Sequence, residues 1–139
     1  MHIAPVEIEG VENALYVVFD GFMRVVTRVL LDAFEGRVVN VHPALLPAFP
    51  GVNAQLQALE AGVKSTGCTV HLVDAGVDTG PILAQATVPV LPTDDLEALR
   101  LRILKEEHRL LPAVVRALAE GKLARYANGR PHLPGFARG

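Results

Sequence analysis

Two polar side chains at the end of a short apolar run could take part in catalysis. The run covers residues 37–41, and Asn40 and His42 lie two positions apart at its end. Because successive side chains of a β-strand point to opposite faces, a strand here would place both on one face. An amide and an imidazole at the carboxyl end of a strand suit a ligand site in an open α/β sheet. The alternative is that His42 only hydrogen-bonds the proline-rich segment that follows.

The loop at residues 74–81 is a second candidate. Asp74 and Asp78 lie there among glycines. They could bind Ca²⁺, but the loop lacks the ligand spacing and the final glutamate of an EF-hand. A solvated turn is the simplest interpretation. The alternative is that Asp78 reaches the His42 imidazole and stabilises its protonated form.

Glu107 is the third candidate, because it lies in the apolar stripe of a predicted long helix. It follows Ile103 by four residues and precedes Leu111 by four. Acidic residues rarely occupy such a position without a partner. Either Glu107 lies at the edge of the stripe and reaches solvent, or it meets a cation from the protein or from a substrate amine.

Other kinds of chemistry find less support. The sequence contains no G-x-x-x-x-G-K-[ST] phosphate loop, no G-x-G-x-x-G motif and no G-x-S-x-G motif. His42, Cys68 and His71 lack the spacing of a zinc site, and we expect no metal. The formal net charge of −2 provides no basic field that would favour a nucleic acid or a membrane. A small molecule is therefore the expected ligand.

The composition predicts one globular domain over residues 1–139. Half of the residues are hydrophobic and 20% are charged, which suits a soluble core of modest size. The single cysteine, Cys68, excludes an internal disulfide. The longest apolar run, at 14–19, is too short to cross a bilayer. The first residues lack the pattern of a secretory signal, so we expect a cytoplasmic location.

Alternating strands and helices are predicted to position the candidate residues. Apolar runs at 14–19, 37–41 and 68–73, and an alternating segment at 82–90, predict strands. Helices are predicted at 23–34, at 53–61 and from Asp94 to Gly121, where Asp94 and Glu97 have the spacing of a capping box. Pro112 is expected to kink or divide the last helix. We expect an α/β sheet, largely parallel, with the direction of its last strand left open and an irregular tail from residue 127.

The candidate residues belong to a longer pattern that resembles a known family. Residues 40–51 (NVHPALLPAFPG) resemble the signature of folate-dependent formyltransferases. Segments 58–64, 66–71 and 77–82, together with 21–24 and 107–108, are similar to phosphoribosylglycinamide formyltransferases. Methionyl-tRNA formyltransferases, which are related, usually have an aromatic-Arg-Gly sequence where this chain has Phe-Pro-Gly. The resemblance implies a Rossmann-like formyltransferase fold, with a mostly parallel sheet flanked by helices.

The resemblance also implies an activity and a set of site residues. The family transfers a formyl group from 10-formyltetrahydrofolate to the amine of glycinamide ribonucleotide, a step of purine biosynthesis. By this resemblance Asn40 and protonated His42 would donate hydrogen bonds to the tetrahedral oxyanion. Asp78 would hold His42 cationic and relay the amine proton, through water. The implied folate contacts are Met23, Arg24, Val25, Val26, Asn40, Asp74, Ala75, Gly76, Val77 and Asp78, and the implied ribonucleotide contacts are Pro43, Leu104 and Glu107.

The sequence departs from the family at several points. Ala44 replaces the usual serine, and Asp20 stands where a small residue is common. The family's first strand and glycine-rich phosphate-binding turn have no counterpart here, so we expect an N-terminally shortened fold. Such a sheet would expose an edge, and a homodimer is one expectation. The functional alternatives are formyl transfer to another amine, hydrolysis of the folate, or a non-catalytic module that binds folate or assembles with other chains.

Overall fold

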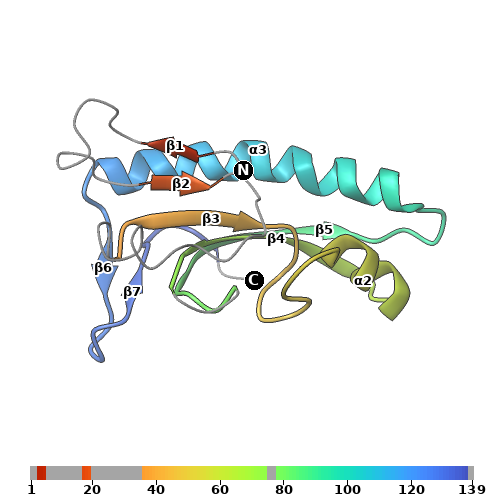
Figure 1. Ribbon diagram of the computed structural model, residues 1–139, viewed down its shortest axis with the longest axis horizontal. Coiled ribbons are helices and arrows are strands. Elements are labelled where there is room, and N and C mark those ends of the chain that lie inside the picture. Colours follow the sequence, from red (N-terminus) through yellow and green to blue (C-terminus); the bar gives the residue numbers. More distant parts are fainter. Residues whose placement is uncertain (1–2, 6–16, 20–35, 75–77, 138–139) are drawn as a thin grey trace.

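The computed structural model describes residues 3–5, 17–19, 36–74 and 78–137. Its main sheet has the order β1-β2-β3-β4-β5, and helices α2 and α3 and the β6–β7 hairpin complete the described part. In Figure 1, α3 runs along the sheet, α2 lies beyond the carboxyl end of β3, and the hairpin lies at the opposite end. The elements are β1 (Ile3–Pro5), β2 (Val17–Phe19), β3 (Val38–His42), α2 (Ala54–Ala61), β4 (Ser65–Leu72), β5 (Ile82–Pro89), α3 (Leu96–Ala119), β6 (Ala124–Arg125) and β7 (Pro131–His132).

The sheet is mixed, and the expectation of a largely parallel sheet is wrong for the described strands. β2 and β3 are parallel, whereas β1–β2, β3–β4 and β4–β5 are antiparallel. A parallel pair needs a crossover that carries the chain back to the starting end of the first strand. Between β3 and β4 the chain instead passes through a proline-rich loop and the short helix α2, both at one end of the sheet. β4 therefore runs in the opposite direction to β3.

The strands β3, β4 and β5 lie where apolar runs predicted strands, with ends that differ by a few residues. β4 begins at Ser65, before the apolar run, because Ser65, Thr66 and Gly67 also pair with β5. This close pairing requires a glycine at position 67, since a Cβ there would lie 1.9 Å from the carbonyl oxygen of Ala86. The predicted helix at 23–34 and residues 14–16 of the first predicted strand lie outside the described residues.

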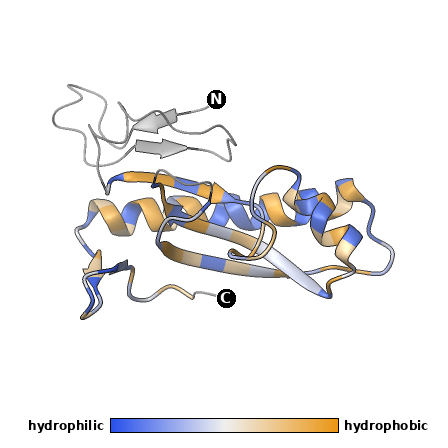
Figure 2. Ribbon diagram, turned by 60° about the horizontal axis from the view of Figure 1, so that its bottom comes forward, coloured by the Kyte–Doolittle hydropathy of each residue, from blue (hydrophilic) through white to orange (hydrophobic). Residues whose placement is uncertain are grey.

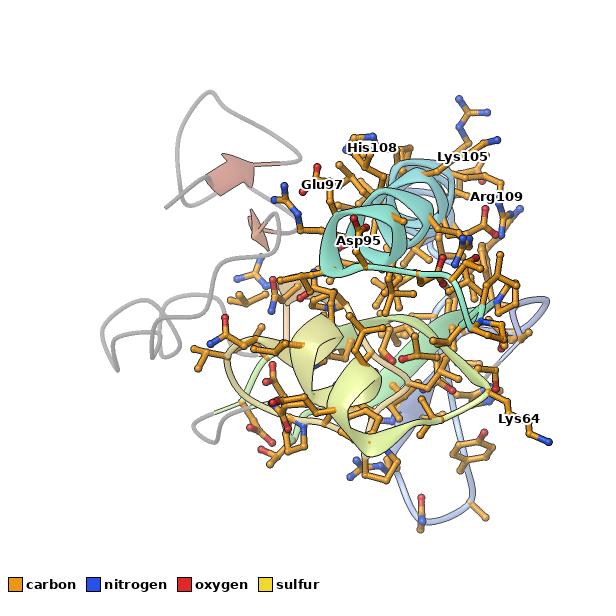
Figure 3. All side chains as sticks on the ribbon, turned by 90° about the vertical axis from the view of Figure 1, so that its right-hand side faces the viewer. Lys64, Asp95, Glu97, Lys105, His108 and Arg109 are labelled. Carbon is orange, nitrogen blue, oxygen red and sulfur yellow. The ribbon has the colours of Figure 1, made fainter. Side chains whose placement is uncertain are left out.

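The long helix α3 covers one face of the sheet. Its buried residues recur at helical spacing and pack against apolar side chains of β3, β4 and β5. Figure 2 shows the resulting alternation of hydrophobic and hydrophilic bands along α3, and Figure 3 shows Lys105, His108 and Arg109 on its outer side. Most of the predicted stripe is buried, but Leu96 is 41% exposed. The buried members are Leu99, Ile103, Leu110, Val114 and Leu118.

The start of α3 differs from the prediction by one residue. Asp95 is the N-cap, and its side chain accepts a hydrogen bond of 2.8 Å from the Ala98 N–H. Asp94 instead accepts from the Leu91 N–H at 2.7 Å and forms an ion pair of 2.6 Å with Arg102. Hydrogen bonds from the Arg102 guanidinium lower the pKa of Asp94 to about 2. The predicted role of Asp94 as cap is therefore wrong.

Pro112 does not divide α3. The helix runs from Leu96 to Ala119 with Pro112 inside it. A proline removes one backbone donor, and the apolar contacts on either side of Pro112 hold the helix against the sheet. Neither described helix combines the length and the hydropathy that a bilayer crossing needs.

The tail is more regular than expected. Strands β6 and β7 pair antiparallel, and the rings of Tyr126 and His132 stack with centroids 4.2 Å apart. Leu133 is buried in the core. The carbonyl oxygen of Ala137 accepts a hydrogen bond of 2.7 Å from the backbone N–H of Gln85 in β5. The tail therefore covers part of the outer edge of β5, which would otherwise be open to pairing.

Candidate active site

The sheet has an apolar face and a polar face, and the candidate site lies on the polar one. Asn40 and His42 of β3 share this face and lie opposite His71 and Thr69 of β4, respectively. All four side chains are buried, with exposed fractions between 0 and 6%. The residues between them face α3 and belong to the core, namely Val39, Val41, Val70 and Leu72. The strand period therefore collects four polar groups away from α3.

His42 is fully buried, and its two ring nitrogens face different partners. Nε2 lies 2.8 Å from the carbonyl oxygen of Phe49 and donates to it, since a carbonyl can only accept. Nδ1 lies 3.4 Å from Oδ2 of Asp78, within ion-pair distance but without a hydrogen bond. Oδ2 of Asp78 in turn accepts a hydrogen bond of 2.8 Å from the Gly51 N–H. The structure thus brings His42 and Asp78 together from separate segments of the chain.

His71 lies near the other oxygen of the Asp78 carboxylate. Its Nδ1 donates to the Leu72 carbonyl at 3.0 Å, and its Nε2 lies 3.7 Å from Oδ1 of Asp78. Burial lowers the pKa of His71, which favours the neutral ring near neutral pH. From the sequence, His71 was predicted neither as a metal ligand nor as a site residue. The signal for its place in the site is its two-residue spacing from Thr69, which matches that of Asn40 and His42.

Three atoms of this cluster have no hydrogen-bond partner within the part of the chain that the structure describes. They are Oδ1 of Asn40, Nδ1 of His42 and Nε2 of His71, and all three are buried. Buried polar atoms are normally satisfied by protein, water or a ligand. Three such atoms gathered on one face of the sheet make this region a candidate site for a polar ligand.

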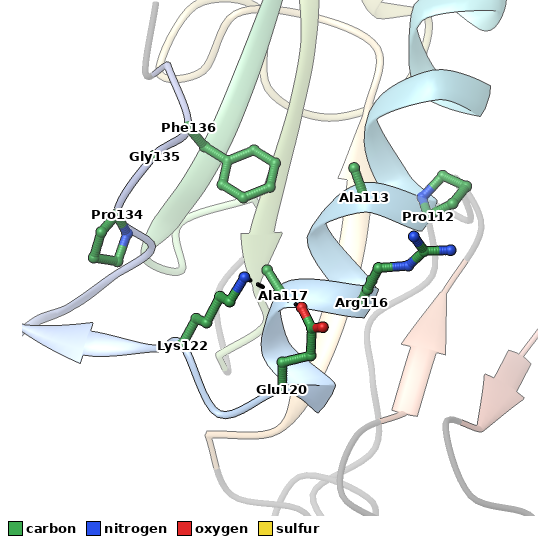
Figure 4. A pocket seen from close by; sticks show the side chains of 9 residues that line it. All are labelled: Pro112, Ala113, Arg116, Ala117, Glu120, Lys122, Pro134, Gly135 and Phe136. Atoms are coloured by element: carbon green, nitrogen blue, oxygen red, sulfur yellow. Dashed lines mark ion pairs between the residues drawn. The ribbon is translucent and has the colours of Figure 1, made fainter.

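A pocket of about 470 Å³ opens beside Asp78. This volume is in the range of small-molecule sites. Its lining is mainly apolar and includes the cationic side chain of Arg130. The lining residues are Leu46, Pro47, Pro50, Asp78, Thr79, Gly80, Ile82 and Arg130. A second pocket lies between the carboxyl end of α3 and the tail, with Arg116, Lys122 and Phe136 in its lining (Figure 4). None of the predicted site residues lines this second pocket.

Glu107 is buried, so the solvent-exposed alternative is wrong. It is 9% exposed and lies on the side of α3 that faces β4. Burial and the Glu107 carboxylate together raise the pKa of Cys68 to about 12. Because Cys68 points to α3, Glu107 and His42 lie on opposite faces of the sheet. Of the other implied ribonucleotide contacts, Pro43 is half-buried directly after His42, and Leu104 is 37% exposed on α3.

Most of the implied folate contacts cannot be placed. Met23, Arg24, Val25, Val26, Ala75, Gly76 and Val77 lie outside the described residues. Asp74 is exposed and accepts a hydrogen bond of 2.7 Å from the Thr79 hydroxyl. Among the residues that the structure does describe, no group of three or more His, Cys, Asp or Glu side chains could hold a metal ion.

The formyl transferase family model matches residues 8–115. This chain belongs to the formyl transferase family. It is 61% identical over 103 residues to phosphoribosylglycinamide formyltransferase of Mycobacterium tuberculosis, which is 74% of this chain and 48% of that protein. It is 50% identical over 98 residues to the Bacillus subtilis protein of the same name, with 70% of this chain and 50% of that protein covered. The chain thus spans about half the length of these curated relatives.

Solved structures of the family share this fold. Glycinamide ribonucleotide transformylase 1 from Symbiobacterium toebii matches with a TM-score of 0.81 at 54% identity, covering 86% of this chain and 56% of that chain. A formyltetrahydrofolate deformylase from Pseudomonas syringae matches with a TM-score of 0.74 at 28% identity, covering 84% of this chain and 38% of that chain. The Rossmann-like α/β formyltransferase fold is therefore confirmed as a class, although the described strands pair mainly antiparallel.

Proposed function

We propose that this chain transfers a formyl group from 10-formyltetrahydrofolate to the amine of glycinamide ribonucleotide. The observation that carries the proposal is the buried His42–Asp78 pair beside Asn40, in which Nδ1 of His42 and Oδ1 of Asn40 make no hydrogen bond within the described chain. The names of relatives 50% and 61% identical to this chain support the choice of substrates. A cytoplasmic location and a homodimer remain predictions.

The first step of the proposed reaction is attack of the amine nitrogen on the formyl carbon. The formyl oxygen then gains negative charge, which hydrogen-bond donors held in place can stabilise. His42 would donate from Nδ1, because its Nε2 proton is already bound to the Phe49 carbonyl. The side-chain amide of Asn40 would supply the second donor. The lack of a hydrogen bond between His42 Nδ1 and Asp78 leaves the Nδ1 proton available to this oxygen.

Asp78 would have two tasks in this reaction. Its negative charge, 3.4 Å from Nδ1, would balance the positive charge of the doubly protonated His42 ring. It would also accept, through a water molecule, the proton that the attacking amine loses. The bond from the carbon to N10 of the folate then breaks, and N10 takes up a proton. The products are the formylated ribonucleotide and tetrahydrofolate.

The remaining implied contacts define how the substrates would lie. Glu107 and Leu104 on α3, together with Pro43, would contact the ribonucleotide. Since Glu107 and His42 are on opposite faces of the sheet, a ribonucleotide that touches both must pass the carboxyl end of β3. The folate would lie against residues 23–26 and the loop 74–78.

A direct assay tests the proposal. The chain is incubated with 10-formyltetrahydrofolate and glycinamide ribonucleotide, and the formylated product is measured by mass spectrometry. We expect His42→Ala to lower kcat by about two to three orders of magnitude, because it removes an oxyanion donor. His108→Ala is the matched control, since His108 is exposed on the outer side of α3, and its kcat should not change.

The other outcomes are distinct. Unchanged turnover in His42→Ala contradicts the proposed role of His42. Release of formate without ribonucleotide would indicate hydrolysis of the folate, the activity named for the deformylase relative. Binding of the folate with no turnover at high ribonucleotide concentration would favour a non-catalytic folate-binding module.

A further inference from the structure

We propose that Gln85 is a positioning residue for the His42–Asp78 site. It is buried on β5, at 7% exposed, and its side-chain hydrogen bonds go to Leu46 and Thr69 rather than to either member of the pair. It would act through the loop of residues 43–51, here called the proline loop, which follows β3. The catalytic consequence rests on the proposed function, whereas the structural consequence can be tested without it.

The side-chain amide of Gln85 is hydrogen-bonded to the proline loop. Its Nε2 donates to the carbonyl oxygen of Leu46 at 2.8 Å and to Oγ1 of Thr69 at 3.0 Å. An amide NH₂ has two protons, and both are used here. The backbone N–H of Gln85 is bonded to Ala137 on the outer edge of β5. Gln85 is therefore fixed at both its main chain and its side chain.

Thr69 extends the same network to two more loop atoms. Its hydroxyl donates to the Ala44 carbonyl at 2.7 Å and accepts from the Leu46 N–H at 3.0 Å, besides the bond from Gln85. A hydroxyl has one donor and two acceptor positions, so Thr69 is fully satisfied. Ala44 and Leu46 are buried, which leaves their backbone groups without access to water. These bonds therefore determine where the first half of the proline loop lies.

The second half of the proline loop makes the contacts that organise the site. The Phe49 carbonyl holds Nε2 of His42, and the Gly51 N–H holds Oδ2 of Asp78. A shift of Leu46 would move both groups, because only a few residues separate them. A displacement of about 1 Å at a catalytic group can cost about 100-fold in rate. Gln85 is thus connected to both His42 and Asp78 through the proline loop.

Exchange of the His42 ring proton tests the structural part directly. In protein labelled with ¹⁵N-histidine, the Nε2 proton should exchange slowly with water, because it is buried and hydrogen-bonded. Gln85→Leu removes both donors, and we expect the exchange of this proton to accelerate at least about tenfold as the Phe49 bond loosens. The Nδ1 proton of His71 is the internal control, since its acceptor, Leu72, lies in β4 rather than in the loop.

Two further variants separate positioning from loss of fold. Thr87→Val changes an exposed residue two positions along β5 and should leave both ring protons unchanged. Gln85→Met keeps the length of the side chain, but a thioether has no proton to donate to Leu46. It should therefore resemble Gln85→Leu, and it replaces that variant if the leucine protein does not fold. Unchanged exchange at His42 in a folded Gln85 variant overturns the proposal, whether or not the chain is active.

The kinetic consequence is measured in the formyl-transfer assay. We expect Gln85→Leu to lower kcat about 10- to 100-fold while KM changes much less, since Gln85 does not touch either substrate. In a background that carries both His42→Ala and Asp78→Ala, the same substitution should have little further effect, because both groups that it positions are gone. Equal losses in both backgrounds would show that Gln85 supports the fold rather than His42, and would contradict the proposal.

Discussion

The two histidines near Asp78 carry their donated ring protons on different nitrogens. His42 donates from Nε2 to Phe49, and His71 donates from Nδ1 to Leu72. The nitrogens that face Asp78 are therefore Nδ1 of His42 and Nε2 of His71. Because burial lowers the pKa of His71, its ring presents a lone pair to Asp78 near neutral pH. Of the two rings, His42 lies nearer to the Asp78 carboxylate, at 3.4 Å against 3.7 Å for His71.

Cys68 allows a test of burial at the residue scale. Desolvation, assisted by the Glu107 carboxylate, raises its pKa to about 12, so the thiol stays protonated near neutral pH. The thiolate is the reactive form. We expect iodoacetamide at pH 8 to leave Cys68 unmodified in the native protein and to modify it after unfolding in guanidinium, as measured by mass spectrometry.

An engineered exposed cysteine provides the comparison for Cys68. Ser65 lies on the same strand but is exposed, so Ser65→Cys should add one reactive thiol in the native state. Rapid alkylation of Cys68 itself in the native protein would show that it is not buried as described.

At the scale of elements, α3 has polar groups that define its start and an apolar side that attaches it to the sheet. Asp95 satisfies a backbone donor at its first turn, and Asp94 connects the preceding loop to Arg102. Gly121 follows its end with a φ of 75°, a conformation that glycine adopts without strain. Between these two ends the helix continues through Pro112, because residues of α3 both before and after Pro112 pack in the core.

The N-cap can be tested by substitution. Asp95→Ala removes the acceptor for the Ala98 N–H and should lower the free energy of unfolding by about 1 kcal/mol. Asp95→Ser keeps a capping oxygen and should retain most of that stability. Urea titration at neutral pH followed by circular dichroism measures both variants. A serine variant as unstable as the alanine variant would show that the cap hydrogen bond is not the source of the loss.

At the scale of the whole molecule, the tail packs into the same core as the sheet and α3. Leu133 follows the β6–β7 hairpin and is 2% exposed among core residues of the sheet and of α3. Phe136 packs against the same core, and Ala137 bonds the edge of β5. The tail thus contributes both apolar burial and edge protection, although its composition predicted irregular structure.

Shortening the side chain of Leu133 tests how much the tail contributes to stability. Leu133→Ala leaves a cavity in the core and should lower the free energy of unfolding by about 2–5 kcal/mol. Leu101→Ala is the control, because Leu101 is 54% exposed on α3 and should change stability by less than about 0.5 kcal/mol. Chemical denaturation compares the two variants. Similar losses in both would mean that the tail is not part of the core.

Some features of this protein follow from local sequence alone. The two-residue spacing of Asn40 and His42 places them on one face of a strand, because the strand period is a property of the backbone. The three- and four-residue spacing of apolar residues likewise predicted α3 and the side of it that is buried. The family was also recognisable from motifs, and the family model matches residues 8–115.

The partners of these elements were decided by the tertiary structure. Local periodicity does not specify the direction of a neighbouring strand, so it did not show that β4 runs antiparallel to β3 and brings His71 opposite Asn40. Nor did it place Gln85 under the proline loop, since that contact joins residues from strands and loops far apart in the chain. Spacing along the chain determines which side chains share a face, whereas only the folded backbone determines which faces and loops meet.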